Sequence, residues 1–378
     1  MTLLENKISN VNELLNAFVF EGEFVKTSQL FDGHINNTYV FDFDCGGEIN
    51  RYLVQELNTY VFKQPEALMN NVMGVTEHMR KKVLENGGDV KRECLQVFPA
   101  KDGNPYYIDS ENRFWRCYNF ITDAHSYQCV DSAETFCNAA KAFGDFQRIL
   151  ADYPSETLVE TIPNFHNTVS RFADFKKAVA DNLSGRAEQA KDEINFVLAR
   201  EKDCSVLLDL LEEGKLPLRV THNDTKLNNV MFDNKTNKGI CVVDLDTVMP
   251  GLSLYDFGDS IRFGANTAAE DEKDVSKVSL SLEYFRAYTY GYLSTAGESL
   301  TKEEINQLAF SSKLLTLECG MRFLGDFING DVYFKTEYPE HNLVRCRTQF
   351  ELVADIERKM DEMQKIVADC CKELGIEK

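Results

Sequence analysis

The segment from Arg219 to Phe232 constrains the fold of this chain more than any other stretch. It places a polar loop, rich in Asn and Asp, between two short runs of apolar and β-branched residues. Fifteen residues after Asn229 comes Asp244, at the end of a second β-branched run that continues to Asp246. We therefore predict a loop between two strands, followed by a hairpin that ends in two carboxylates.

The loop reads His222-x-Asp224-x-Lys226-x-x-Asn229, which is the spacing of the catalytic loop of eukaryotic-like kinases. In such a site the Asp takes the proton of the attacking hydroxyl. The Asn and an Asp of the next hairpin hold Mg²⁺ against the nucleotide phosphates. A polar turn between core strands explains one or two of these residues, but not all of them together with Asp244. The pattern therefore favours phosphoryl transfer.

Composition excludes several other classes of function. The chain has 378 residues and a net charge of −20, which argues against nucleic acid and anionic membranes as partners. Its eleven cysteines are irregularly spaced, as is typical of reduced thiols rather than of disulfides or a zinc site. Residues Met1–Lys7 do not read as a signal peptide, and no apolar run reaches membrane-spanning length. We expect a cytoplasmic protein.

Hydrophobic periodicity predicts two lobes. Residues 1–121 show a first helix up to about residue 20 and then mostly strand patterns, which predicts a small sheet with one long helix. The strand-like stretches are Thr38–Phe43, Arg51–Leu57, Cys94–Phe98 and Asn112–Ile121, and the long helix is Asn70–Leu84. Residues 122–378 are predominantly helical. The expected helices are Phe136–Leu150, Phe165–Leu183, Ala187–Leu211, Val275–Thr295, Lys302–Asn329 and Arg345–Leu374.

With these motifs in place, the chain resembles the aminoglycoside/choline phosphotransferase family of kinase-like folds. Longer stretches resemble its N-acetylhexosamine 1-kinase branch, over nearly the whole chain. They are Asp32–Tyr39, Phe165–Thr168, Asp244–Gly251, Tyr255–Arg262, Glu318–Leu324 and Gly330–Lys335. The resemblance implies an α+β, bilobal, protein-kinase-like fold, with a nucleotide-binding N-lobe (1–121) and a helical C-lobe (122–378) that carries the catalytic loop and the acceptor pocket.

The resemblance also implies an activity and its residues. The branch uses ATP and Mg²⁺ to phosphorylate the anomeric hydroxyl of N-acetylglucosamine or N-acetylgalactosamine. The implied catalytic residues are Asp224 and Lys226, and the implied metal ligands are Asn229, Asp244 and Asp246. The implied nucleotide-binding residues are Gly33, Asn37, Thr38, Gln55, Asn119 and Ile121. The implied sugar-binding residues are His34, Phe263, Arg322 and Tyr333. Asp256 is expected to brace the catalytic loop rather than to react.

Two departures from the family pattern bear on the phosphates. The loop before the first hairpin has Phe31-Asp32-Gly33 where a Gly-x-Gly start is usual. Gln55 stands where kinases carry a phosphate-pairing lysine. A neutral amide cannot offset phosphate charge, so Lys226 or the metal must carry more of that load.

Two other functions stay open at this point. One is a kinase of the same fold that acts on choline, homoserine or an aminoglycoside. The other is a nucleotide-binding pseudokinase. The sequence does not decide between the two hexosamine epimers, nor does it decide the need for the N-acetyl group, the nucleotide preference or the oligomeric state.

Overall fold

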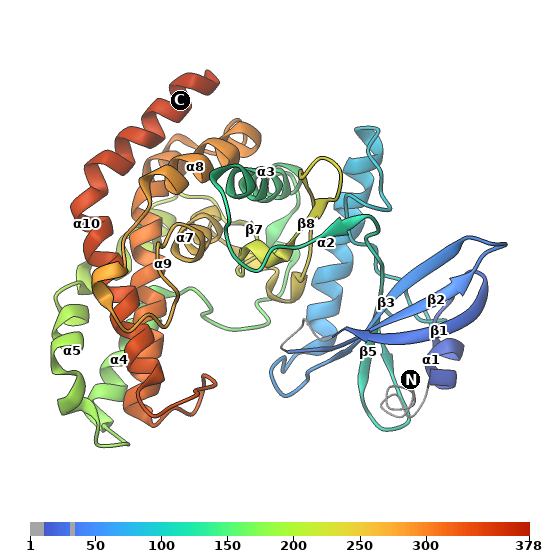
Figure 1. Cartoon of the computed structure of the whole chain (residues 1–378), viewed down its shortest axis with the longest axis horizontal. Coiled ribbons are helices and arrows are strands. Elements are labelled where there is room, and N and C mark those ends of the chain that lie inside the picture. The colour runs from blue at the N-terminus through green and yellow to red at the C-terminus, as the bar shows by residue number, and fades with distance from the viewer. Residues whose placement is uncertain (1–10, 31–34) are drawn as a thin grey trace.

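The computed structural model describes residues 11–30 and 35–378. Figure 1 shows an antiparallel sheet beside a larger helical part. The sheet has five strands in the order β1-β2-β3-β5-β4. Their bounds are Glu23–Leu30 (β1), Asn37–Asp44 (β2), Ile49–Leu57 (β3), Tyr107–Ile108 (β4) and Phe114–Asn119 (β5). Helix α1 (Val11–Ala17) and the long helix α2 (Pro65–Glu85) belong to the same part of the chain.

The two faces of this sheet carry different side chains, because successive residues of a strand point to opposite faces. One face carries Phe41, Val54 and Trp115 into a hydrophobic core that Leu14 of α1 closes. Polar residues of β2, β3 and β5 lie on the other face and line a cleft, as described below. The sheet therefore rests on one core and leaves its second face for a ligand.

The predictions for the first 121 residues differ from the structure in four places, and the part of the first predicted helix before Val11 lies outside the described residues. Strands β1 and β4 were not predicted, and α2 begins at Pro65, before the predicted Asn70. The prediction of a strand over Cys94–Phe98 is wrong, since the described ladder there is one isolated bridge between Val97 and Tyr118. The Asn119 side chain accepts a hydrogen bond from the Gln96 N–H and donates one to the Cys94 carbonyl. These bonds satisfy backbone groups that a strand would pair with a neighbouring strand.

Long helices make up most of the rest. Their bounds are Ala133–Ile149 (α3), Thr168–Asp181 (α4), Lys191–Leu198 (α5), Val206–Glu212 (α6), Ser253–Gly264 (α7), Leu282–Ala296 (α8), Lys302–Asn329 (α9) and His341–Leu374 (α10). Helix α9 packs against α7, α4 and α10, and α3 packs against α8 (Figure 1). The predicted bounds of α9 are confirmed. Its start is fixed by a capping box between Thr301 and Glu304, and its end by Gly330 with φ 97°.

Two helix predictions need correction. The single helix expected over Ala187–Leu211 is divided into α5, α6 and two 3-10 turns. The Thr168 hydroxyl donates to the Cys204 carbonyl at 2.5 Å, so a tertiary bond replaces a helical one at the break. The helix expected from Val275 begins only at Leu282. Helix α7 was not predicted at all.

Two small sheets hold the predicted loop and hairpin. Strand β7 (Arg219–Thr221) pairs with β10 (Met249–Gly251), and β8 (Val230–Asp233) pairs with β6 (Ala124–His125) and β9 (Gly239–Val242). The prediction of a loop between two strands, followed by a hairpin, is confirmed. Among the described helices, none is long and apolar enough to cross a membrane. The boundary between residues 121 and 122 stays a prediction.

Candidate active site

A cleft of ≈ 400 Å³ lies where the inner face of the five-stranded sheet meets the loop after β7 and the segment after β9. It collects residues that the sequence analysis named separately. Those that line it are Thr38, Gln55, Asn119, Ile121, Asp224, Lys226, Asn229, Asp244 and Asp246. The chain therefore brings the predicted catalytic, metal and most of the predicted nucleotide residues to one place.

The backbone of the catalytic loop is hydrogen-bonded to Asp256 on α7. One oxygen of this buried carboxylate accepts the N–H of Asn223 at 2.8 Å, and the other accepts the N–H of His222 at 2.9 Å. The Gln147 amide donates to the same carboxylate at 3.0 Å. Asn223 has φ 64°, a left-handed conformation that costs energy outside glycine. Asp256 thus stabilises a strained turn one residue before Asp224, as the sequence analysis expected.

Asp224, Lys226 and Asn229 contact one another at the end of this loop. The Lys226 ammonium lies 2.8 Å from one Asp224 oxygen, and the Asn229 amide donates to the other at 3.2 Å and to the Asp224 carbonyl at 2.8 Å. Burial opposes the charge of Lys226, but the Asp224 carboxylate raises its pKa. Asp224 is therefore oriented by two donors where it lines the cleft.

The segment after β9 is tied to the catalytic loop through His222. Its Nε2–H donates to the Val243 carbonyl at 2.9 Å, while its Nδ1 accepts the Asp224 N–H at 3.3 Å. The next residue, Asp244, has φ 60° and a carboxylate that is exposed to the cleft and accepts no hydrogen bond from any described residue. Desolvation by the surrounding protein, then the nearby Asp246 and Asp224, raises the pKa of Asp244 to about 6.

This donor set fits Mg²⁺. The described residues contain no group of three or more His, Cys, Asp or Glu side chains arranged for a metal. Mg²⁺ commonly takes only one or two carboxylates and completes its shell with water and phosphate oxygens. Asp244 with the side-chain oxygen of Asn229 matches that demand, and the repulsion among neighbouring carboxylates is what a divalent cation relieves.

Asp246 has partners that the sequence did not suggest. One of its oxygens forms an ion pair with Arg116 of β5, and the other accepts the Asn36 amide at 2.7 Å. Arg116 also donates from Nε to the Gln55 oxygen at 3.0 Å, and the Gln55 amide nitrogen donates to Thr38 at 2.9 Å. Both carboxylate oxygens of Asp246 therefore contact protein groups, and the role of Asp246 as a metal ligand stays a prediction.

The remaining nucleotide predictions divide into three groups. Asn119, the last residue of β5, and Ile121 both line the cleft, and the Asn119 side chain fixes the neighbouring backbone. Asn37 does not line the cleft, because strand alternation turns it outward to Glu56, and its neighbour Asn36 lies in the cleft instead. Gly33 lies outside the described residues, as does His34, which was predicted to bind the sugar.

The predicted sugar residues lie on the helical side. The Arg322 guanidinium is 5.8 Å from the ring centres of Phe165 and Tyr333 and 5.5 Å from that of Phe334. Asp326 accepts the backbone N–H groups of residues 332–334, which fixes the segment that carries Tyr333. Tyr333 is 71% exposed, as an open site requires. Phe263 is partly buried against the core, and among the described ring contacts none joins it to Arg322.

His166, from the stretch Phe165–Thr168, contacts both α9, the helix that carries Arg322, and the catalytic loop. Its Nδ1 lies 2.9 Å from Glu318, and its Nε2 lies 3.4 Å from the Asn223 carbonyl. Both partners are acceptors, an arrangement that favours the doubly protonated ring. Burial opposes this charge, but the Glu318 carboxylate raises the pKa of His166.

Sequence reasoning missed Arg116, Asn36 and His166 as members of the site. Arg116 had a usable signal: an arginine in the middle of the apolar run Phe114–Tyr118 must find a partner when it is buried. Asn36 had none, since a change of one residue in strand register decides whether Asn36 or Asn37 faces the cleft.

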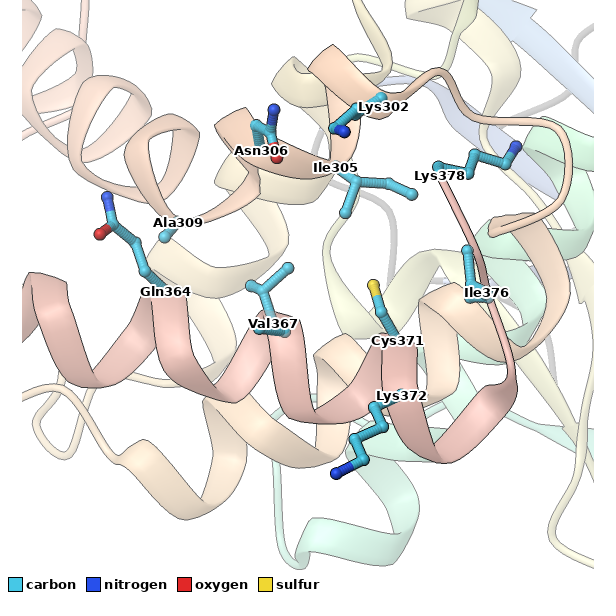
Figure 2. Close-up of a pocket in the computed structure, with 11 residues that line it drawn as sticks. Lys302, Ile305, Asn306, Ala309, Gln364, Val367, Cys371, Lys372, Ile376 and Lys378 are labelled. Atoms are coloured by element: carbon cyan, nitrogen blue, oxygen red, sulfur yellow. The ribbon is translucent and has the colours of Figure 1, made fainter.

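A second hollow, of ≈ 580 Å³, lies between the start of α9 and the end of α10 (Figure 2). Figure 2 shows Lys302, Lys372 and Lys378 around it, with Ile305 and Cys371 between them. Lys378 donates to the carbonyl of Glu298 at 2.7 Å. Among the described residues that line this hollow none is acidic, so it offers no carboxylate as a general base or as a ligand for Mg²⁺. The cleft around Asp224 is the candidate active site.

Comparison with known proteins agrees with this choice. A family model described as the phosphotransferase enzyme family matches residues 43–296, which include the catalytic loop and the β8–β9 hairpin that follows it. Three solved structures are similar over most of both chains. They are a microcompartment-associated aminopropanol kinase (TM-score 0.51, 16% identity, 93% of this chain and 97% of that chain), a spectinomycin phosphotransferase in complex with ADP and spectinomycin (0.53, 11%, 90% and 94%) and a choline kinase from Cryptosporidium parvum (0.52, 14%, 91% and 92%). Such likeness shows the fold, which is the expected bilobal kinase-like α+β fold.

Proposed function

The chain belongs to the phosphotransferase enzyme family, and we propose that it uses ATP and Mg²⁺ to phosphorylate the anomeric hydroxyl of N-acetylglucosamine or N-acetylgalactosamine. The observation that carries the proposal is the convergence of Asp224, Asn229 and Asp244 on one cleft. This is the set that phosphoryl transfer needs for proton acceptance and for holding the metal. The product is the sugar 1-phosphate.

Asp224 is the proposed base. The transferred phosphoryl group passes through a loose transition state, so the enzyme mainly positions groups and neutralises charge. Asp224 orients the C1 hydroxyl toward the γ-phosphorus and accepts its proton late in the transfer. Lys226, whose ammonium lies 2.8 Å from the Asp224 carboxylate, orients Asp224 and contacts the γ-phosphoryl oxygens.

The metal would be held by Asn229 and Asp244. When bound, Mg²⁺ would neutralise the negative charge that develops on the phosphate oxygens. His222 keeps the two ligand segments in register, because it bonds both the Val243 carbonyl and the Asp224 N–H.

The charge around Arg322 supports a neutral acceptor. Arg322 lies among three aromatic rings, one of them the exposed Tyr333. A permanent cation at this place repels a choline-like or polyamine acceptor, whereas a guanidinium and a ring face together bind sugar hydroxyls and an acetamido oxygen well. The acidic residue Asp259 is ion-paired to Arg262 and so does not offer a free site for an amine.

One observation favours a second candidate, phosphorylation of an amino alcohol or an aminoglycoside. Glu318 is buried, and one of its oxygens has no hydrogen-bond partner among the described residues. Such an oxygen could receive an ammonium group. The aminopropanol and choline kinases among the similar structures act on substrates of that kind by their names.

The test is ATP turnover by the purified protein on a panel of acceptors. The panel contains the two N-acetylhexosamines, the parent hexoses, choline, aminopropanol and an aminoglycoside, and ³¹P NMR reads the position of the phosphate. We expect an anomeric phosphate from the N-acetylhexosamines and slower turnover of the parent hexoses. Exclusive turnover of an amine acceptor would replace this proposal with the second candidate.

Arg322→Ala separates the acceptor pocket from the nucleotide site. Loss of a charged donor to a sugar costs roughly 1.5–3 kcal/mol, so we expect KM for the sugar to rise by about 10- to 100-fold with KM for ATP nearly constant. Arg286→Ala is the matched control, because Arg286 is a surface arginine paired with Glu373 on α10. If Arg322→Ala lowers Tm without changing sugar kinetics, Arg322 stabilises the fold and does not bind the acceptor.

A further inference from the structure

The cleft lacks the lysine on β3 that kinases direct at the nucleotide phosphates, and a cation lies one strand away. Gln55 on β3 and Arg116 on β5 are direct cross-strand partners in the antiparallel ladder. We propose that Arg116 binds the phosphates of the nucleotide, in the place that a lysine at position 55 would otherwise reach. This inference rests on the proposed use of ATP and concerns a residue that the sequence analysis assigned to no role.

The contacts of Arg116 leave part of its guanidinium for a ligand. Its Nε donates to Gln55, and its Nη1 forms the ion pair with Asp246. The Nη2 nitrogen donates to no described residue, and it is not fully buried, since the residue lines the cleft. A ligand in the cleft can therefore reach it. Phosphate oxygens are the acceptors that a guanidinium matches best.

The charges of the cleft require such a cation. Among the described residues that line it, Arg116 and Lys226 are the only arginine or lysine side chains. Lys226 is already paired with Asp224 at the catalytic end. The carboxylates of Asp244 and Asp246 line the same cleft, so triphosphate binding without Arg116 would meet uncompensated negative charge.

Gln55 serves Arg116 rather than the phosphates. Its oxygen accepts the Nε–H of Arg116 at 3.0 Å and its nitrogen donates to Thr38 at 2.9 Å, so both ends of the amide are used. The ring of Tyr118 lies 5.1 Å from the guanidinium carbon. These contacts fix the plane of the guanidinium and hold its Nη2 edge in one direction. A lysine at position 55 would place a second cation against Arg116 and lose this support.

The test measures ADP and adenosine binding by calorimetry in the presence of Mg²⁺, without any acceptor. Three variants are compared with the wild type: Arg116→Lys, Arg116→Gln, and the exchange Gln55→Lys with Arg116→Gln. We expect Arg116→Lys to weaken ADP by about tenfold and Arg116→Gln by about 100-fold, with adenosine nearly unchanged. The exchange should recover at least about tenfold of the loss, because it restores a cation on the neighbouring strand.

Arg116→Gln leaves Asp246 unpaired, and the variant can fail to fold for that reason alone. Arg116→Lys and the exchange each retain one cation at the cross-strand pair of positions 55 and 116, so either one that folds decides the question through its ratio of ADP to adenosine affinity. Equal loss of ADP and adenosine, or ADP affinity within about threefold of wild type in Arg116→Lys, overturns the proposal.

The outcome is distinct from that of the proposed function. If the wild type binds ADP but phosphorylates no sugar, the acceptor assignment fails and the Arg116 experiment is unaffected. If sugar is phosphorylated and the Arg116 variants keep their preference for ADP over adenosine, only the role of Arg116 fails.

Discussion

Removing the carboxylate of Asp256 should disable catalysis without any direct contact with substrate. Asp256 accepts three hydrogen bonds, from the N–H groups of His222 and Asn223 and from the Gln147 amide, and it is 2% exposed. Burial raises the pKa of Asp256, while the nearby His222 and the three donors work in the opposite direction. The three donors therefore favour the ionised carboxylate of Asp256 against the effect of burial.

The magnitude follows from these contacts. A buried donor that loses its acceptor costs about 1–3 kcal/mol, so Asp256→Ala should lose roughly 3–6 kcal/mol of unfolding free energy once overlap among the three bonds is allowed for. Asp256→Asn keeps one acceptor oxygen but turns an NH₂ group toward a backbone N–H, which should cost roughly 1–3 kcal/mol. The asparagine variant is therefore the one expected to fold and to be measurable.

The catalytic effect of Asp256→Asn should exceed its effect on nucleotide binding. Asn223 is held in a left-handed conformation directly before Asp224, so relaxation of this turn moves the base relative to the acceptor hydroxyl. A displacement of about 1 Å near the reacting atoms can cost about 100-fold in rate. We expect kcat to fall by about 100-fold while calorimetric affinity for Mg·ADP changes by less than about threefold.

Asp355→Asn is the matched control. Asp355 is also a buried aspartate that accepts a backbone N–H, from Leu280 at 2.7 Å, but it lies on α10 among Lys359 and Arg358. This substitution should lower stability and leave kcat unchanged. If Asp256→Asn loses stability while kcat stays within about threefold of wild type, the loop is held by other contacts and the reasoning is wrong.

Three further predictions concern the base, the metal and the fold. Asp224→Asn should lower kcat by about 10²–10⁴ with Mg·ADP affinity retained, as steady-state kinetics and calorimetry would show; turnover within about threefold of wild type would remove Asp224 as the base. Asp244→Ala should abolish the Mg²⁺-dependent gain in ADP affinity, and unchanged Mg·ADP affinity with full activity would make it a structural carboxylate. Arg219 holds Glu304 ionised: burial opposes the charge, but hydrogen bonding and charge from Arg219 lower the pKa of Glu304. Because its pKa is lower in the folded state, the ionised Glu304 stabilises the fold above its unfolded pKa of about 4.3, and this stability is lost as the pH falls. In urea unfolding, Glu304→Gln should therefore be less stable than wild type at pH 7, and the difference in unfolding free energy should shrink below about pH 4. A difference that does not depend on pH would contradict this.

Local sequence signals predicted the parts of the structure that local chemistry determines. The loop His222–Asn229 and the hairpin after it are recognisable because their functional residues lie close together in sequence. The bounds of α9 follow from a capping box and a closing glycine, both local devices. The long-range features were predicted less well. The break at Cys204 comes from a bond to Thr168, and the irregular path of Cys94–Phe98 comes from the Asn119 side chain.

The candidate site follows the same division. The grouping of Asp224, Asn229 and Asp244 could be predicted from their spacing in the sequence alone. The position of Arg116 could not, because it depends on how β5 pairs with β3. The sequence shows that position 55 is neutral, but not which residue of β5 stands opposite it, because register depends on turn geometry and on which face is buried. The choice between Asn36 and Asn37 depends on the same register.

The charges of the cleft explain how a neutral residue at position 55 is compatible with phosphate binding. The described lining holds the carboxylates of Asp224, Asp244 and Asp246 and the cations of Arg116 and Lys226, so without a metal it is one charge negative. Each cation is paired with one carboxylate, which leaves Asp244 as the uncompensated group, with a pKa raised to about 6. A free nucleotide meets net repulsion there, whereas a magnesium-bound nucleotide brings the cation that Asp244 lacks. Nucleotide binding should therefore depend on the metal more strongly than on any single basic side chain.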